Sequence, residues 1–310
     1  MFHLVADLPL RFLRGLRSVS SAAHFVFTQV MPTVKRTTMS KPMDKTTAMS
    51  SALTSSDILY FTEHGSGPPL ILVHGLGMSG NMFEPIVEPL SKRHRLIIPD
   101  LRGCGRSRNL PPPYSVRQQA ADLAVLLDHL GITSADALGY SQGGPVVQEL
   151  ALDYPAKVRR LILSNTYAYN MATMKEKIEG HIVPLLIRLL GVRLFVKLLI
   201  SQGLKQIPKE QGAWVASLIA STWGEADAKS IALAWREAMA FDSRARLKEI
   251  KCPTLVVAGS NDVGVPLHHA RMLHDGITGS QLVIIDDADH ALIWTRPEEL
   301  VRATEELLRQ

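Results

Sequence analysis

The chain has 310 residues, 46% of them hydrophobic and 20% charged, which is ordinary for a globular protein of one large or two smaller domains. The formal net charge of +5 belongs to residues 1–56, because the remaining residues hold 27 basic and 27 acidic side chains, so a nucleic-acid partner is not expected. The chain has only two cysteines, Cys104 and Cys252, which excludes a disulfide framework. It has no apolar run of 18 residues or more, so we expect no integral membrane segment.

Residues 1–56 form a basic leader that is rich in Ser and Thr and nearly free of acids. Organelle transit peptides have this composition. It also suits a disordered segment, an ordered arm, or an overlong gene start that precedes a true start at Met39, Met43 or Met49. We expect a cytoplasmic protein, with organelle targeting by residues 1–56 as the alternative.

From about residue 57 short apolar runs alternate with helix-like segments. Such runs are typical of parallel strands that are buried on both faces. The expected strands are 58–62, 70–73, 96–98, 135–140, 161–163, 254–258 and 282–285. Between them, apolar residues of 116–130 recur at helical spacing. The alternation predicts a doubly wound, mostly parallel α/β sheet that binds its ligand at the carboxyl ends of the strands.

Residues 165–247 interrupt this alternation with helix-like segments near 171–190, 193–202, 209–221 and 227–240. We interpret them as a helical cap inserted into a core made of residues 57–164 and 248–310. The cap is rich in apolar side chains, among them Trp214, Trp223 and Trp235. These side chains either contact an apolar portion of a substrate or pack the cap on itself.

The most informative motif is Gly-Tyr-Ser-Gln-Gly at 139–143, between an expected strand and a helix-ready segment at 145–152. This context is that of a nucleophile elbow, in which a strained turn lifts the serine hydroxyl clear of the sheet. Ser141 is therefore the candidate nucleophile. The turn also leaves the backbone N–H of Gln142 at a helix N-terminus, where it can face a developing negative charge.

A serine nucleophile needs a base and a group that orients the base. Asp262 and His290 follow two later strands, in the order Ser, Asp, His that this architecture requires. The alternatives are that Asp262 caps a turn and that His290 is a surface histidine. Nearby Asp286, Asp287 and Asp289 compete with Asp262 for the orienting role, but a solvated position suits them better.

The second oxyanion donor is expected in the His-Gly-Leu-Gly stretch at 74–77, with the backbone N–H of Leu76 paired with that of Gln142. His74 is expected to stabilise this loop. His268, His269 and His274 lack a companion carboxylate in the sequence pattern, so we expect surface residues and no metal site.

Three stretches resemble successive signatures of the α/β-hydrolase superfamily, at 74–77, 100–107 and 139–144. The resemblance covers residues 57–310 and is similar to the branch of carboxylesterases, enol-lactonases, C–C bond hydrolases and cofactor-free haloperoxidase-like enzymes. It implies an α/β-hydrolase fold with Ser141 as nucleophile, His290 as base and Asp262 as its orienter, and no cofactor.

These residues predict a serine hydrolase that cleaves a small-molecule carboxylic ester or lactone through an acyl-enzyme. C–C bond hydrolysis and haloperoxidase or perhydrolase chemistry would use the same triad. A binding protein that keeps the fold without turnover is a further alternative. The sequence leaves homo-oligomerisation open.

Overall fold

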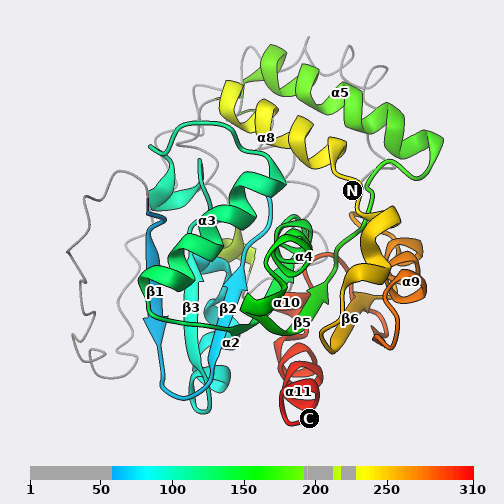
Figure 1. Ribbon diagram of the computed structural model, residues 1–310. Helices are drawn as coiled ribbons and strands as arrows, with labels where there is room; N and C mark the ends of the chain where they lie inside the picture. Colours follow the sequence, from blue (N-terminus) through cyan, green and yellow to red (C-terminus); the bar gives the residue numbers. More distant parts are fainter. Residues whose placement is uncertain (1–57, 192–193, 195–211, 218–227) are drawn as a thin grey trace. The chain divides into compact units, whose positions relative to one another are not determined.

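The computed structural model describes residues 58–191, 194, 212–217 and 228–310. The predictions for residues 1–56, for Trp223 and for nearly all of 193–202 lie outside these residues. Seven strands form one sheet in the order β1-β3-β2-β4-β5-β6-β7, in which β1 is antiparallel to β3 and all other neighbours are parallel (Figure 1). The predicted doubly wound, mostly parallel sheet is therefore confirmed. The strands are β1 Phe61–His64, β2 Pro69–Val73, β3 Arg95–Pro99, β4 Ala135–Tyr140, β5 Val158–Ser164, β6 Thr254–Gly259 and β7 Gln281–Ile285.

The first strand begins three residues later than the sequence predicts. The N–H of Tyr60 donates to Ser107 Oγ at 2.8 Å instead of entering the ladder with β3. The strand then continues to His64, because the turn begins only at Gly65. Gly65 has a φ of +73°, a conformation that is unfavourable for residues with a side chain.

Helices cover both faces of the sheet, as the apolar residues on each face require. One buried cluster joins the sheet to α2, α10 and α11, and a second joins its other face to α3, α4 and α9. These helices are α2 Glu84–Ser91, α3 Val116–His129, α4 Gly143–Asp153, α9 Leu267–Gly276, α10 Leu292–Thr295 and α11 Pro297–Leu308. No helix within the described ranges is both long and apolar enough to cross a bilayer.

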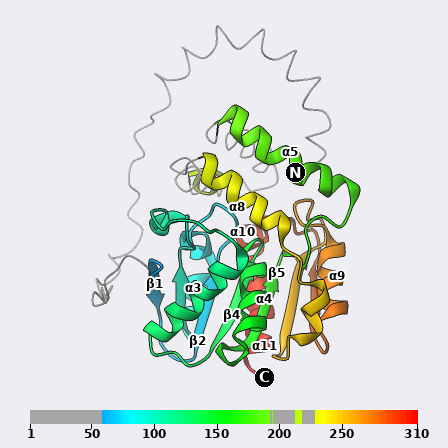
Figure 2. The ribbon, with the colours of Figure 1, turned by 45° about the horizontal axis from the view of Figure 1, so that its top comes forward.

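The described part of the 165–247 segment is helical, with α5 Met174–Leu190, residues 212–217 and α8 Ala228–Ala240. Helices α5 and α8 lie side by side beyond the carboxyl ends of β4 and β5 (Figure 2). Val183 and Ile231 belong to the same buried cluster as Tyr140 in β4. Near the two ends of this segment, Tyr169 and Asp242 pair in an isolated antiparallel β-bridge. Its assignment as a cap stays a prediction.

Candidate active site

Ser141 occupies a sharp turn between β4 and α4. All six residues of β4 are buried, and the chain reverses at Ser141 with a φ of +52°, a conformation that only a well-supported turn retains. A Cβ at Gly143 would lie 2.0 Å from the carbonyl oxygen of Val73, so only glycine fits where the turn passes β2. Thr166 Oγ1 donates to the Ser141 carbonyl at 2.6 Å and fixes the turn from the β5 side.

Ser141, His290 and Asp262 meet at the carboxyl edge of the sheet. His290 Nε2 lies 3.0 Å from Ser141 Oγ, and His290 Nδ1 lies 2.8 Å from Asp262 Oδ2. Asp262 follows β6 and His290 follows β7, so parallel neighbouring strands deliver both side chains to the same place. The Asp262 side chain is 1% exposed and that of His290 is 35% exposed, so solvent reaches the imidazole and not the carboxylate.

Four donors surround the Asp262 carboxylate. Backbone N–H groups of Gly264 and Val265 donate to Oδ1, each at 2.8 Å, and Asn165 Nδ2 donates to Oδ2, also at 2.8 Å, beside His290. Burial alone would raise the pKa of Asp262, but His290 and the hydrogen bonds outweigh it and lower the pKa. Burial opposes the positive charge on His290, yet Asp262 outweighs it and raises the pKa of the imidazole.

Two supporting residues escape the sequence analysis. Asn165 follows β5 in a left-handed conformation, φ +47°, and also donates to the Asp289 carbonyl at 3.2 Å. Tyr140 donates its phenol to the His290 carbonyl at 2.7 Å and accepts from the Ile293 N–H at 3.3 Å. The available signal for Asn165 was a polar side chain directly after a buried strand.

Of the competitors for the place of Asp262, Asp286 and Asp287 are exposed and Asp289 is half-buried.

Leu76 and Gln142, the residue after Ser141, both line one small cavity. Within the described residues neither N–H donates a hydrogen bond to a protein group, so both can serve a ligand oxygen. Buried His74 holds the Leu76 loop: its Nδ1 lies 2.8 Å from the Gly75 carbonyl, and its Nε2 accepts from the Leu101 N–H at 2.9 Å. Burial lowers the pKa of His74, which keeps the ring neutral for these contacts.

The remaining wall of this cavity is mainly apolar. Leu76, Tyr114 and Ile231 contribute apolar surface, and Gln119 lies among them. Gln119 Nε2 donates to the Tyr114 carbonyl at 2.9 Å, and its buried Oε1 has no partner among the described residues. The cavity measures about 30 Å³, room for a water molecule, so its lining would have to move to admit a larger ligand.

Cys104 also lines this cavity, but it is a poor candidate for the nucleophile. Burial raises the pKa of its thiol to about 12, so the reactive thiolate is scarce at neutral pH. Ser141 is therefore the better-equipped nucleophile at this site.

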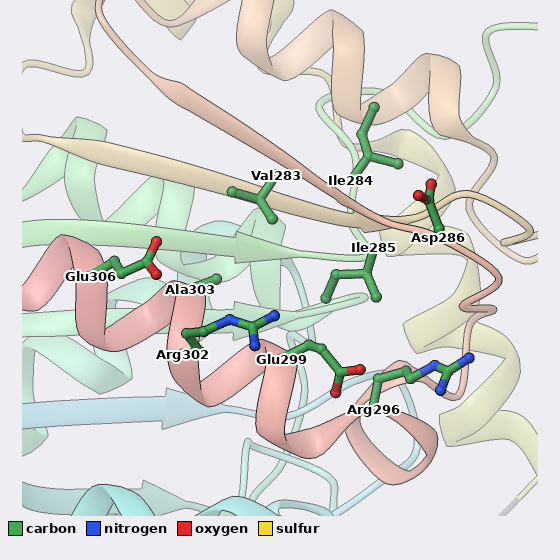
Figure 3. A pocket seen from close by; sticks show the side chains of 9 residues that line it. All are labelled: Val283, Ile284, Ile285, Asp286, Arg296, Glu299, Arg302, Ala303 and Glu306. Carbon is green, nitrogen blue, oxygen red and sulfur yellow. The ribbon is translucent and has the colours of Figure 1, made fainter.

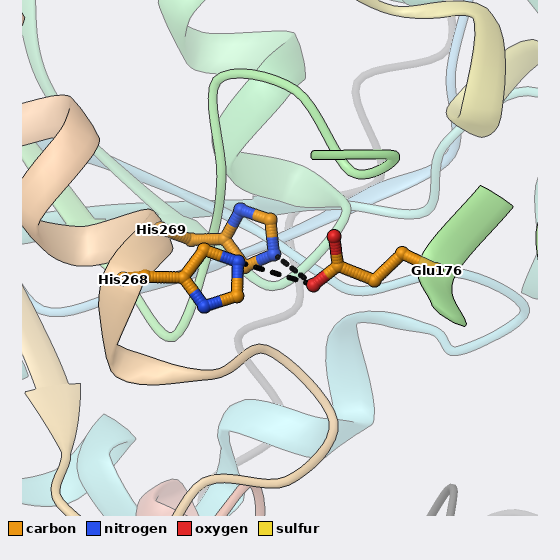
Figure 4. Close-up of side chains that lie close together, drawn as sticks. All are labelled: Glu176, His268 and His269. Atoms are coloured by element: carbon orange, nitrogen blue, oxygen red, sulfur yellow. Dashed lines mark hydrogen bonds and ion pairs between the residues drawn. The ribbon is translucent and has the colours of Figure 1, made fainter. Parts of the chain in front are cut away.

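The expectation of surface histidines is wrong for His269, which is fully buried. His268 and His269 lie in the first turn of α9, and both point their Nε2 atoms at Glu176 Oε1 from α5 (Figure 4). The companion carboxylate escaped the sequence pattern because it lies 93 residues before His269 in the chain.

A larger cavity, about 400 Å³, lies between β7 and α11 (Figure 3). Ser141, Asp262 and His290 are not among the residues that line it. Arg296, Glu299, Arg302 and Glu306 line it with apolar residues of β7. None of its lining residues carries a hydroxyl or a thiol, so the smaller cavity next to Ser141 is the better candidate for serine chemistry.

Comparisons with known proteins agree with the fold. Residues 68–189 match the family described as the alpha/beta hydrolase fold, and residues 221–309 match the family described as TAP-like protein. A putative carbamate hydrolase RutD from Rhizobium rhizogenes is 30% identical over 254 residues, which are 78% of this chain and 94% of the relative.

Two solved structures are similar over 81% of this chain. An esterase from Thermogutta terrifontis is 30% identical with a TM-score of 0.71 and is covered over 93% of its length. The enol-lactonase from Burkholderia xenovorans LB400 is 25% identical with a TM-score of 0.72 and is covered over 96%.

Proposed function

Because the chain belongs to the α/β-hydrolase superfamily, we propose that it is a serine hydrolase that cleaves a carboxylic ester or lactone through an acyl-enzyme. One observation carries the proposal: a continuous chain of hydrogen bonds joins Ser141 Oγ, both nitrogens of His290 and Asp262 Oδ2. A hydroxyl beside a neutral imidazole that a buried carboxylate orients is the arrangement that makes serine nucleophilic at neutral pH.

In the acylation step, Ser141 Oγ attacks the substrate carbonyl carbon while His290 Nε2 takes the hydroxyl proton. The carbonyl oxygen becomes an oxyanion between the N–H groups of Leu76 and Gln142, which stay unpaired until it forms. Asp262 holds the Nδ1 proton and stabilises the imidazolium. His290 then protonates the leaving alkoxide, and the acyl group stays on Ser141 as an ester.

Deacylation reverses these roles with water as the nucleophile. His290 is 35% exposed, so a water molecule can reach Nε2 once the alcohol has left. The imidazole takes a proton from this water, whose oxygen attacks the acyl carbon. The second oxyanion uses the same two N–H groups, and its collapse releases the acid and returns the proton to Ser141 Oγ.

The apolar wall of the cavity favours a substrate with an apolar body. Leu76, Tyr114 and Ile231 offer apolar contact to it.

Carbamate hydrolysis is a second candidate, because relatives 29–30% identical are described as putative carbamate hydrolases. C–C bond hydrolysis of a diketone and perhydrolase or haloperoxidase chemistry would use the same three residues. A non-catalytic binding protein would leave Ser141 unreactive.

The test compares the wild type with Ser141→Ala, and with Ser260→Ala as the matched control on a neighbouring loop. The substrates are esters and lactones of varied acyl chain, a carbamate and a diketone. We expect ester or lactone turnover to fall about 10⁴-fold or more in Ser141→Ala with an unchanged melting temperature, and Ser260→Ala to keep it. A fluorophosphonate should label the wild type at Ser141 and leave Ser141→Ala unlabelled.

Retention of ester hydrolysis near the wild-type rate in Ser141→Ala would refute the mechanism. A wild type that resists the fluorophosphonate would favour a binding protein. Fastest turnover of the carbamate or the diketone would keep the nucleophile and replace the substrate class.

A further inference from the structure

Three potential metal ligands from two separate elements converge beside the cavity wall. Glu176 Oε1 lies 3.1 Å from His268 Nε2 and 3.0 Å from His269 Nε2 (Figure 4). All three atoms lie within 4.8 Å of one another. The glutamate comes from the first turn of α5 and the histidines from the first turn of α9, so only the folded chain assembles the cluster.

The spacing of these atoms suits a tetrahedral metal ion. Zinc bonds to nitrogen and oxygen are about 2.0–2.1 Å long, which places neighbouring ligand atoms of a tetrahedron roughly 3.3 Å apart. The separations of Glu176 Oε1 from the two histidine nitrogens, 3.0 and 3.1 Å, fall a few tenths of an ångström short of this value, and the two nitrogens lie within 4.8 Å of each other. A small outward movement of the Glu176 carboxylate would lengthen the two short separations. Two imidazoles and one carboxylate form a donor set that zinc uses.

A backbone hydrogen bond orients the Glu176 carboxylate. Glu176 Oε2 accepts the Thr173 N–H at 2.7 Å, so its second oxygen stays directed at the histidines. The side chain of His269 has no exposed surface, that of Glu176 is 13% exposed and that of His268 is 41% exposed. An ion could enter from the His268 side, where a water molecule would complete the coordination.

We propose that Glu176, His268 and His269 bind a zinc ion that clamps α5 to α9. Helix α9 begins five residues after Asp262, and His269 packs edge-on against Tyr167, whose phenol donates to Gln142 Oε1. The ion would thus fix the first turn of α5 against the wall that carries an oxyanion donor. The proposal does not depend on the reaction that Ser141 performs.

Isothermal titration of the untagged full-length protein with zinc chloride, after removal of metals with a chelator, tests this assignment. We expect one equivalent bound by the wild type, and binding weaker on the order of 100-fold or more in His268→Gln and Glu176→Gln. Glutamine at 176 can still accept the Thr173 N–H, and His268 is the most exposed ligand, so both variants should fold. His181→Gln is the matched control, since His181 is exposed on the same α5 and lies outside the cluster.

A second readout uses cobalt(II) in place of zinc. The wild type and His181→Gln should show the visible absorption of a tetrahedral cobalt site and a melting temperature that rises with the metal, and His268→Gln should show neither. Absence of stoichiometric zinc in the wild type, or unweakened binding in His268→Gln and Glu176→Gln, would overturn the assignment. The first result would leave a pair of imidazole N–H groups hydrogen-bonded to a carboxylate.

Discussion

Replacing Asp262 with asparagine tests how far the proposed reaction depends on one proton of His290. The carboxylate accepts on both oxygens, from Gly264 and Val265 on one side and from Asn165 and His290 on the other. An amide has one accepting oxygen, so its NH₂ must face two donors in either orientation. The two backbone N–H groups cannot change, whereas His290 can lose its Nδ1 proton.

The amide nitrogen of Asp262→Asn should therefore face His290 and force the proton onto Nε2. That tautomer donates toward Ser141 Oγ and cannot take its proton. In hydrolases with the same relay, the wrong tautomer costs about 10⁴ in kcat, which corresponds to about 5.5 kcal/mol in the activation free energy. The new amide NH₂ would also face the NH₂ group of Asn165, and two donors cannot bond to each other. This loss of a hydrogen bond should lower the free energy of unfolding by about 1–3 kcal/mol.

Steady-state kinetics on the best ester or lactone, together with thermal unfolding, measure both effects. Asp289→Asn is the matched control: it is the same chemical change one residue from His290, and an amide oxygen there can still accept the Ala291 N–H. A folded Asp262→Asn within tenfold of the wild-type kcat would refute the tautomer argument. An equal loss in Asp289→Asn would show that the effect is not specific to Asp262.

Two further predictions concern the base and the turn. Asp262 raises the pKa of His290, and the proposed base must be neutral, so kcat/KM should rise with pH through a midpoint above 6.5; a midpoint at or below 6.5 in a pH–rate profile would contradict this. Gly143→Ala should lower the free energy of unfolding by about 1–3 kcal/mol, because its Cβ would lie 2.0 Å from the Val73 carbonyl oxygen. Gly212→Ala, whose Cβ would meet no atom of the described residues within 4 Å, should leave the melting temperature nearly unchanged, and equal shifts in both variants would argue against the clash.

Features that depend on a strand and the residues just after it could be predicted from the sequence. Parallel strands end at a common edge, so Asp262 and His290 were placed near Ser141 without any knowledge of side-chain orientation. The start of β1 was misplaced because a hydroxyl 47 residues away, Ser107 Oγ, takes the N–H of Tyr60. Apolar periodicity carries no trace of such a contact.

Contacts between elements distant in the chain were out of reach for the same reason. Glu176 is the N3 residue of a capping box with Thr173, which is a local contact that accounts for one of its oxygens. The other oxygen contacts His269 only because the folded chain brings the first turn of α5 next to the first turn of α9. Asn165 likewise gains its partner Asp262 from the packing of β5 beside β6.

The phenol of Tyr140 has a mechanical consequence for the proposed nucleophile and base. Tyr140 lies one residue before Ser141. Its phenol donates to the His290 carbonyl and accepts from the Ile293 N–H. These two bonds tie the His290 loop to the strand end that carries Ser141, so the loop cannot move away from that strand end without breaking them. Burial raises the pKa of Tyr140 well above its ordinary value, so this tether keeps its proton across the pH range in which a serine hydrolase works.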